Sequence, residues 1–87
     1  MTTTAKNIKD AYKVAKARRA AAAAAVRNPL IEEDEFMAIV DAECEAYDVL
    51  IDALIEFSAG AITARDASNI VLSRFDKLGT LVERLAA

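Results

Sequence analysis

The chain has 87 residues with 14 acidic and 11 basic side chains, no histidine and a formal net charge of −3. That length predicts one domain over residues 1–87, and a single chain of this size buries only about 60 to 65% of its unfolded surface. With no tryptophan, two glycines and one proline, the composition indicates an all-α fold. The net acidity argues against a general binder of nucleic acids or membrane surfaces.

The absence of targeting signals predicts a cytoplasmic protein. Residues 1–6, Met-Thr-Thr-Thr-Ala-Lys, lack the apolar core of a signal peptide. The alanine run that ends at Arg27 is far shorter than the roughly 20 apolar residues of a membrane span, so no membrane association is expected. The single cysteine, Cys44, cannot form an internal disulfide and fits a reducing compartment.

Two breaks in the helical periodicity divide the chain into three expected helices. Pro29 removes a backbone donor and disfavours a helical conformation for the residue before it. Further on, Gly60 is suited to a left-handed helix end and Thr63 to capping the next helix. We therefore expect a three-helix bundle or a helical hairpin with an added N-terminal helix, with helices over about residues 5–27, 30–58 and 64–85.

The first expected helix is basic and rich in alanine. Up to Asn28 the chain carries seven basic residues against one acid, which gives a net charge of +6. Few of its apolar residues are large, so intrinsic propensity stabilises this helix more than burial does. It either lies close against the hairpin of its own chain or of a second copy, or projects as an arm toward a partner.

A row of cations on this helix is a candidate nucleic-acid surface. Lysines three and four residues apart share one helix face and could contact phosphates in a salt-dependent manner. Tyr12 is the only aromatic residue among them, and no familiar nucleic-acid module is recognisable. The alternatives are a solvated face and pairing with the acidic second helix. The basic face consists of Lys6, Lys9, Lys13, Lys16, Arg18 and Arg19.

The second expected helix combines a wide apolar arc with strong acidity. From Pro29 to Thr63 there are ten acids and no base, which gives a net charge of −10. Apolar side chains recur at three- and four-residue spacing, which predicts contact with more than one neighbour. Cys44 is expected as an inert buried thiol and Tyr47 as a core residue. The main stripe is Met37, Val40, Cys44, Tyr47, Ile51 and Leu54.

Carboxylates on the same helix form the principal candidate binding surface. Four consecutive acids start the helix, where each interacts with the helix dipole by about 0.3 to 1 kcal/mol at best. They are denser than capping requires, and five more acids continue along one side at spacings of four, three, four and four residues. The predicted partner-binding face is Glu32, Glu33, Asp34, Glu35, Asp41, Glu45, Asp48, Asp52 and Glu56.

The third expected helix carries an apolar arc that would close a hairpin with the second helix. This arc contains Arg74, whose stem is expected to pack there while its guanidinium reaches an acid of the second helix. Because these arcs leave more apolar surface than three short helices can cover, we expect an intertwined or packed homodimer. The arc comprises Ile70, Val71, Phe75, Leu78, Val82 and Leu85.

Two acidic pairs resemble elements of the all-α nucleoside triphosphate pyrophosphatases. Glu32-x-x-Glu35 and Glu45-x-x-Asp48 look similar to that family's E-x-x-E and E-x-x-D elements, in which four carboxylates from separate helices converge on magnesium. The resemblance implies a metal-dependent hydrolase. Here both elements fall on one expected helix, and about 15 Å of helical rise separates Glu35 from Glu45.

These patterns favour a non-enzymatic protein–protein interaction module. We expect no catalytic, cofactor or metal site, and a partner that is itself a nucleic-acid-handling protein with a basic groove. Carboxylates about 5 to 6 Å apart along a helix resemble the charge spacing of a nucleic-acid backbone. The hypothesis is a phage or mobile-element inhibitor or accessory protein, located in the host cytoplasm. Direct nucleic-acid binding and the metal-dependent pyrophosphatase are the alternatives.

Overall fold

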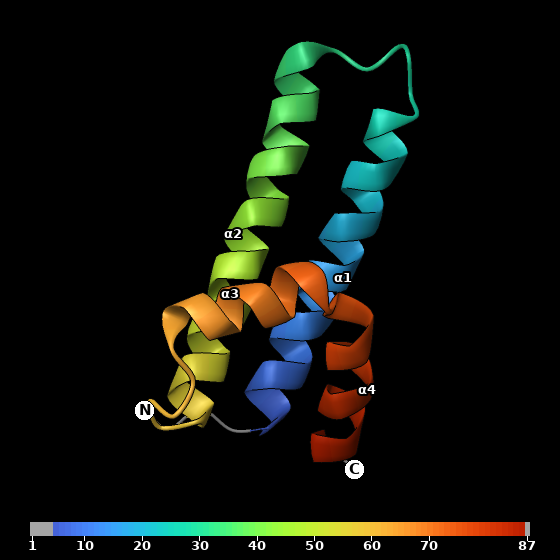
Figure 1. The fold of residues 1–87 in the computed structure, drawn as a ribbon. Coiled ribbons are helices and arrows are strands. Elements are labelled where there is room, and N and C mark those ends of the chain that lie inside the picture. The colour runs from blue at the N-terminus through green and yellow to red at the C-terminus, as the bar shows by residue number, and fades with distance from the viewer. Residues whose placement is uncertain (1–4, 87) are drawn as a thin grey trace.

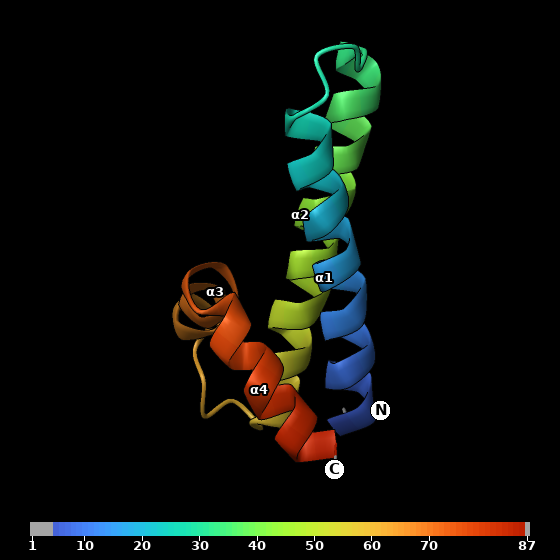
Figure 2. The ribbon, with the colours of Figure 1, turned by 90° about the vertical axis from the view of Figure 1, so that its right-hand side faces the viewer.

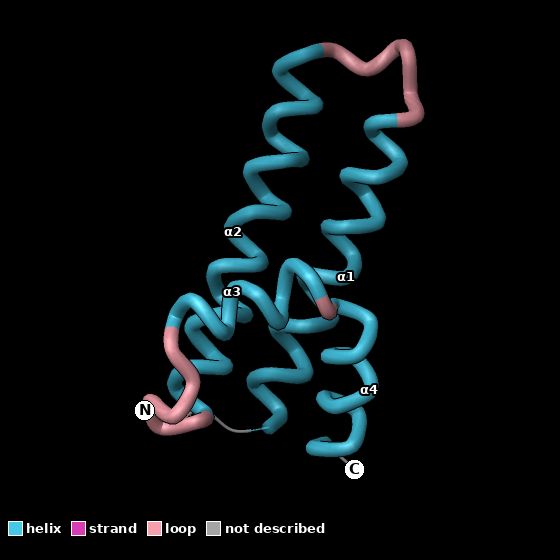
Figure 3. Tube along the Cα trace, in the orientation of Figure 1, coloured by secondary structure: helices cyan, strands magenta, loops and turns pink. Residues whose placement is uncertain are grey.

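The computed structural model describes the backbone of residues 5–86 and the side chains of residues 6–82. Its regular structure consists of α1 (Ala5–Val26), α2 (Glu33–Phe57), α3 (Ala64–Ser73) and α4 (Phe75–Ala86). Figure 3 shows these helices and the loops that join them. Within the described residues all regular structure is helical, which confirms the expected all-α class.

Helices α1 and α2 form a long antiparallel hairpin, joined at one end by the loop of residues 27–32 (Figure 1). Alanine on α1 allows this close approach because a short side chain adds little to the distance between helix axes. Helix α1 also packs against α4 of its own chain. Of the two arrangements left open by the sequence, the structure therefore shows α1 packed within its own chain.

Helix α2 begins at Glu33, three residues later than expected. The Asn28 side chain accepts a hydrogen bond from the backbone nitrogen of Leu30 at 3.0 Å, which closes a turn around Pro29. Glu32 then takes an extended conformation as the N-cap residue, and its carbonyl accepts from Phe36 at 2.9 Å. The turn at Asn28 therefore moves the start of the helix from about residue 30 to Glu33.

The connection from α2 to α3 contains the left-handed glycine and the N-cap residue that the sequence predicted. Gly60 has φ +84° and its neighbour Ala59 has φ +54°, so two residues take the left-handed conformation after α2. The Thr63 hydroxyl accepts from the backbone nitrogen of Asp66 at 3.1 Å and caps α3. Ser58, which sequence reasoning did not single out, donates to the Ile55 carbonyl and accepts from Ile62.

The prediction of one continuous helix over residues 64–85 is wrong, because the chain turns at Arg74 and forms two helices, α3 and α4. Arg74 has φ −133° and ψ 36°, outside the helical range. No proline or glycine marks this turn, so tertiary packing overrides helix propensity here. The turn lets α3 pack against α2 while α4 packs against α1. The Arg74 side chain is exposed, so its expected place within an apolar arc is also wrong.

One hydrophobic core draws on all four helices. The residues buried in it are Ile8 and Ala15 of α1, Ala46, Leu50 and Leu54 of α2, Ala67 and Val71 of α3, and Phe75, Leu78 and Val82 of α4. Within the described residues, no helix has the length and hydrophobicity that a membrane crossing requires.

Helices α3 and α4 cover one side of the hairpin, and only the half that lies away from the loop of residues 27–32 (Figure 2). We call this covered part the proximal half. The distal half consists of residues 20–26 of α1 and 33–44 of α2. Its buried side chains within the described residues are Ala22 and Ala25, both of which lie outside the main core.

Candidate interaction surfaces

The acidic surface predicted from the sequence lies exposed along α2. Helix α2 runs without a break from Glu33 to Phe57. Its row from Asp41 to Glu56 therefore extends over about 22 Å of one rod, at 1.5 Å per residue. All nine predicted residues are exposed: Glu32, Glu33, Asp34, Glu35, Asp41, Glu45, Asp48, Asp52 and Glu56.

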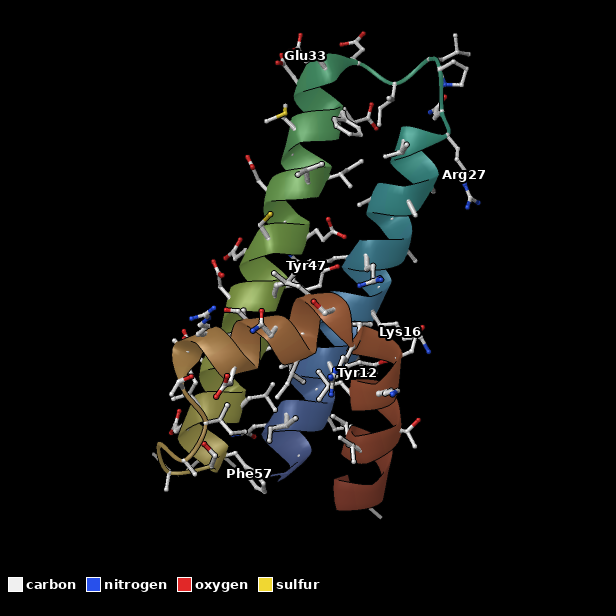
Figure 4. The ribbon with its side chains drawn as sticks, viewed as in Figure 1. Tyr12, Lys16, Arg27, Glu33, Tyr47 and Phe57 are labelled. Atoms are coloured by element: carbon white, nitrogen blue, oxygen red, sulfur yellow. The ribbon has the colours of Figure 1, made fainter. Side chains whose placement is uncertain are left out.

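Four of these acids gather at the tip of the hairpin, where α2 begins. Glu33, Asp34 and Glu35 occupy the first turn of α2, so they face the positive end of its dipole. The Glu32 side chain makes no capping hydrogen bond. Figure 4 shows Glu33 beside the loop and Arg27 at the end of α1. The tip thus carries a dense negative charge.

Glu43 differs from the other acids of α2 because it belongs to the interior side of the helix. It is half-buried, and its Oε2 accepts a hydrogen bond of 2.9 Å from the Tyr47 hydroxyl. Burial raises the pKa of Tyr47, and the hydrogen bond and negative charge of Glu43 raise it further. Arg19 acts in the opposite direction and lowers this pKa. The phenol is therefore held in its neutral, donating form.

Five of the six predicted basic residues of α1 are exposed, including Arg18 and Arg19. Lys6, Lys13 and Lys16 are exposed, whereas Lys9 is half-buried. The two predicted arginines also make contacts within the chain.

Arg18 and Arg19 are directed toward neighbouring helices. Arg18 donates from a guanidinium nitrogen to the Ala42 carbonyl of α2 at 3.1 Å. The guanidinium carbon of Arg19 lies 4.8 Å from the ring centroid of Phe75, a cation–π contact with α4. The sequence carried no local signal for either contact, since each depends on how the helices meet.

An aromatic cluster joins α1, α2 and α4 at the upper limit of the proximal half. The Phe75 ring stacks on Tyr12 with centroids 4.8 Å apart, and Tyr47 meets Phe75 edge-on at 6.1 Å. A Cβ at Gly79 would overlap the Tyr12 hydroxyl, so glycine is what allows α4 to approach α1 here. The sequence predicted Tyr47 as a core residue but did not predict Phe75 as the centre of a cluster.

The expectation of a buried Cys44 is wrong, because its thiol-bearing side chain is exposed. Cys44 shares its stripe with Met37 and Val40, which are exposed and half-buried. In the same stripe Ile51 is half-buried and Leu54 is buried. Helix α3 covers the stripe only along the proximal half, so its distal members are more exposed than its proximal ones.

The structure does not bring together the four carboxylates of the pyrophosphatase-like pairs. Glu32 and Glu35 lie at the tip, whereas Glu45 and Asp48 lie in the middle of the same straight helix. Among the described residues, no group of three or more acidic or cysteine side chains could hold one metal ion.

An apolar cavity of about 470 Å³ opens at the proximal end of the bundle, and the sequence did not predict it. It lies between the end of α2 and helices α3 and α4. Its lining is Leu54, Phe57, Ser58, Ile62, Ile70, Leu78, Leu81 and Val82.

Comparisons with known proteins add no assignment to this geometry. No protein-family model, no curated protein and no solved structure matches this chain.

Proposed function

We propose that this protein is a non-enzymatic protein–protein interaction module that works as a homodimer and presents the acidic face of α2 to a basic groove of a nucleic-acid-handling partner. The observation that carries this proposal is the set of nine exposed carboxylates, eight on α2 and one on its N-cap residue Glu32. Within the described residues, no ion pair or hydrogen bond occupies them. They are therefore available to a partner.

The spacing of these acids supports a basic partner. Carboxylates three and four residues apart lie about 5 to 6 Å from one another on a helix face, close to the charge spacing along a nucleic-acid strand. A row of one sign also steers a basic partner toward the helix and speeds its association at low salt. The biological setting that we propose on this charge pattern is a phage or mobile-element inhibitor or accessory protein.

Partner capture with neutralised variants tests the acidic face. The variant with Asp41→Asn, Glu45→Gln, Asp48→Asn and Asp52→Asn keeps the helix but removes four charges. We expect the wild-type chain to capture a basic protein from a host lysate, the captured protein to be released by excess duplex DNA or RNA, and the variant to capture none.

A matched control changes the same number of charges elsewhere. The variant with Lys6, Lys9, Lys13 and Lys16 all replaced by Gln should capture as the wild-type chain does, and circular dichroism should show equal helicity for all three proteins. Capture that persists without the four acids, or that nucleic acid cannot displace, would contradict the proposal.

Direct nucleic-acid binding through α1 is the second candidate, because Lys6, Lys13 and Lys16 are exposed on it. With about three phosphate contacts, log K against log salt should have a slope near −3. Gel shifts at about 50 and 200 mM salt would reveal this dependence. If no shift occurs at either salt concentration, this candidate is removed.

A further inference from the structure

A groove runs along the side of the hairpin that faces away from α3 and α4. Tyr12 of α1 and Tyr47 of α2 both contact Phe75 of α4. Val14 and Val49 each follow one of these tyrosines by two residues, a rotation of about 200° around the helix, so they point to the opposite side. Val14 is 46% exposed and Val49 is 56% exposed, and both line the groove. Figure 2 shows that, within the described residues, α3 and α4 stand on the other side of the hairpin and leave this side open.

The shape of the groove suits a third helix. Its volume is about 370 Å³, and its described lining comes from α1 and α2. Ala11 and Ala46 form the floor between the helices, where they are half-buried and buried. The lining extends over residues 7–18 of α1, which rise about 17 Å, or three helical turns. A helix that packs on two others at an interaxial distance of about 8 to 10 Å would fill this space with its side chains and remove the two valines from water.

The two edges of the groove differ in charge. Glu45 lines the groove from α2, and Asp41 and Asp52 lie on the same edge, four residues before it and seven after it. On α1, Asp10 lines the groove and Lys13 lies one turn further along that edge. All five side chains are exposed. The α2 edge is therefore acidic, whereas the α1 edge carries both signs.

A cation in the lining lies at the distal end of the groove and leaves its acidic edge unchanged. This cation is Arg18, whose guanidinium donates to the Ala42 carbonyl of α2 at 3.1 Å. The described lining contains two acids, Asp10 and Glu45, and this one base, which gives a net charge of −1. An apolar occupant with basic residues along its α2 edge therefore matches the groove, and an acidic occupant would be repelled.

We propose that this groove receives an amphipathic helix of the partner protein, with an apolar stripe against Val14 and Val49 and with lysines or arginines along the edge that faces α2. This inference rests on the proposed function and identifies one wall of the partner's basic groove. A helix laid in a groove with apolar anchors three and four residues apart is a common mode of recognition. A second copy of this chain does not offer such a helix in its described residues, because its basic helix α1 already buries Ile8 and Ala15 in its own core.

Two synthetic peptides of equal composition test the chemistry of the occupant. Both have about 18 residues, enough to span the groove as a helix, and consist of leucine, alanine, lysine and glutamine. In the first peptide the leucines form one helical stripe with the lysines along one of its edges. In the second peptide the order is changed so that no stripe forms. Fluorescence anisotropy should show that the first peptide binds and that the second binds about tenfold more weakly or not at all. Equal binding of the two peptides would overturn the proposal.

Matched variants of the chain test the location of the site with the first peptide. The double variant Val14→Gln, Val49→Gln makes the walls of the groove polar and should weaken binding about tenfold or more. Leu72→Gln makes the same kind of change on α3, at a residue that is 58% exposed, and should bind as the wild type does. Each of these side chains is about half in water, so circular dichroism should show equal helicity for all three proteins. Unchanged binding by the double variant, or an equal loss in Leu72→Gln, places the peptide elsewhere and overturns the proposal.

Partner capture with the same double variant separates this inference from the proposed function. We expect Val14→Gln, Val49→Gln to lose the basic partner that the wild-type chain captures, although it keeps every acid of α2. If the double variant still captures that partner while the variant with four neutralised acids does not, the proposed function stands and the groove proposal is overturned. If the first peptide binds at the groove but no basic protein is captured, the groove proposal stands and the proposed function is overturned.

Discussion

The proximal and distal halves of the α1–α2 hairpin are built from the same two helices but are packed very differently. In the proximal half Ile8 and Leu50 are fully buried, together with Val71 and Val82 of the covering helices. In the distal half the buried side chains are Ala22 and Ala25. An alanine removes far less apolar area from water than a leucine or isoleucine does. Stability is therefore concentrated where α3 and α4 supply a further layer.

The comparison also explains how α2 can leave much of its surface exposed. Helix α2 is anchored by its proximal end, where Leu50 and Leu54 pack in the main core, and it runs unbroken to its distal end. The distal end and the outer acidic row can then stay exposed because the anchor, not their own burial, maintains the helix. Such an anchor matters because most of the stability of a helix in a protein comes from tertiary packing of its apolar face.

The largest expected effect contrasts one apolar residue of α2 from each half. Leu50→Ala should lower the free energy of unfolding by about 2 to 5 kcal/mol, because it removes a fully buried side chain from the proximal core. Ile39→Ala, at a half-buried distal position, should lower it by about 1 kcal/mol. Urea denaturation followed by circular dichroism measures both.

Two outcomes bear on this contrast. Equal losses for the two variants would show that the distal half is packed as tightly as the proximal half. Where Leu50→Ala leaves too little folded protein for a baseline, Ile8→Val probes an equally buried site with an expected loss of about 1 kcal/mol.

A smaller effect is expected where α4 meets α1. Gly79→Ala would raise the stability of an isolated helix by up to about 1 kcal/mol, but its Cβ would overlap the Tyr12 hydroxyl and separate Tyr12 from Phe75. Overpacking of this kind costs about 1 to 3 kcal/mol, so we expect a net loss near 1 kcal/mol.

The neighbouring residue supplies the control for this substitution. Thr80→Ala, at an exposed position of the same helix, should be neutral or slightly stabilising in thermal denaturation. A Gly79→Ala chain that is more stable than wild type would show that α1 and α4 are not in close contact at Tyr12.

The smallest effect concerns Tyr47, at the boundary between the halves. Burial and Glu43 raise its pKa in the folded chain, so the phenol's contribution to stability is complete below its ordinary pKa of 10 and is lost as pH rises through the folded value. Tyr47→Phe removes the hydrogen bond to Glu43, which is worth about 1 kcal/mol. Wild type should therefore exceed Tyr47→Phe in stability at pH 8, and this difference should shrink above pH 10.

Urea midpoints for the two chains at pH 8, 10 and 11 measure that difference. The single-residue comparison cancels the titration of lysines and of Tyr12, which both chains share. A difference that stays constant up to pH 11 would contradict the assigned environment of Tyr47.

Local features of the fold and of the candidate site were predictable from the sequence because they depend on neighbours in the chain. The helical class followed from composition and periodicity, the end of α2 from Gly60, and the cap of α3 from Thr63. The acidic row followed in the same way, since residues three and four apart in a helix share a side whatever the helix packs against. These predictions were confirmed in position.

Features that depend on contacts between distant segments were not predictable. The turn at Arg74 has no proline or glycine and exists because α3 packs on α2 while α4 packs on α1. The exposure of Cys44 was not predicted for the same reason. An apolar stripe in the sequence does not indicate how much of the helix a neighbouring helix will cover. The contacts of the exposed Arg18 and Arg19 with a carbonyl of α2 and with the Phe75 ring likewise depend on how the helices meet.

By itself the sequence determined that this protein is helical, where α3 is capped, and that α1 is basic while α2 is acidic. Only the tertiary structure decided which of those helix faces are buried and which remain open. The physical reason is that periodicity and charge are properties of a few adjacent residues. Burial, in contrast, depends on which distant segment of the chain packs against each helix face.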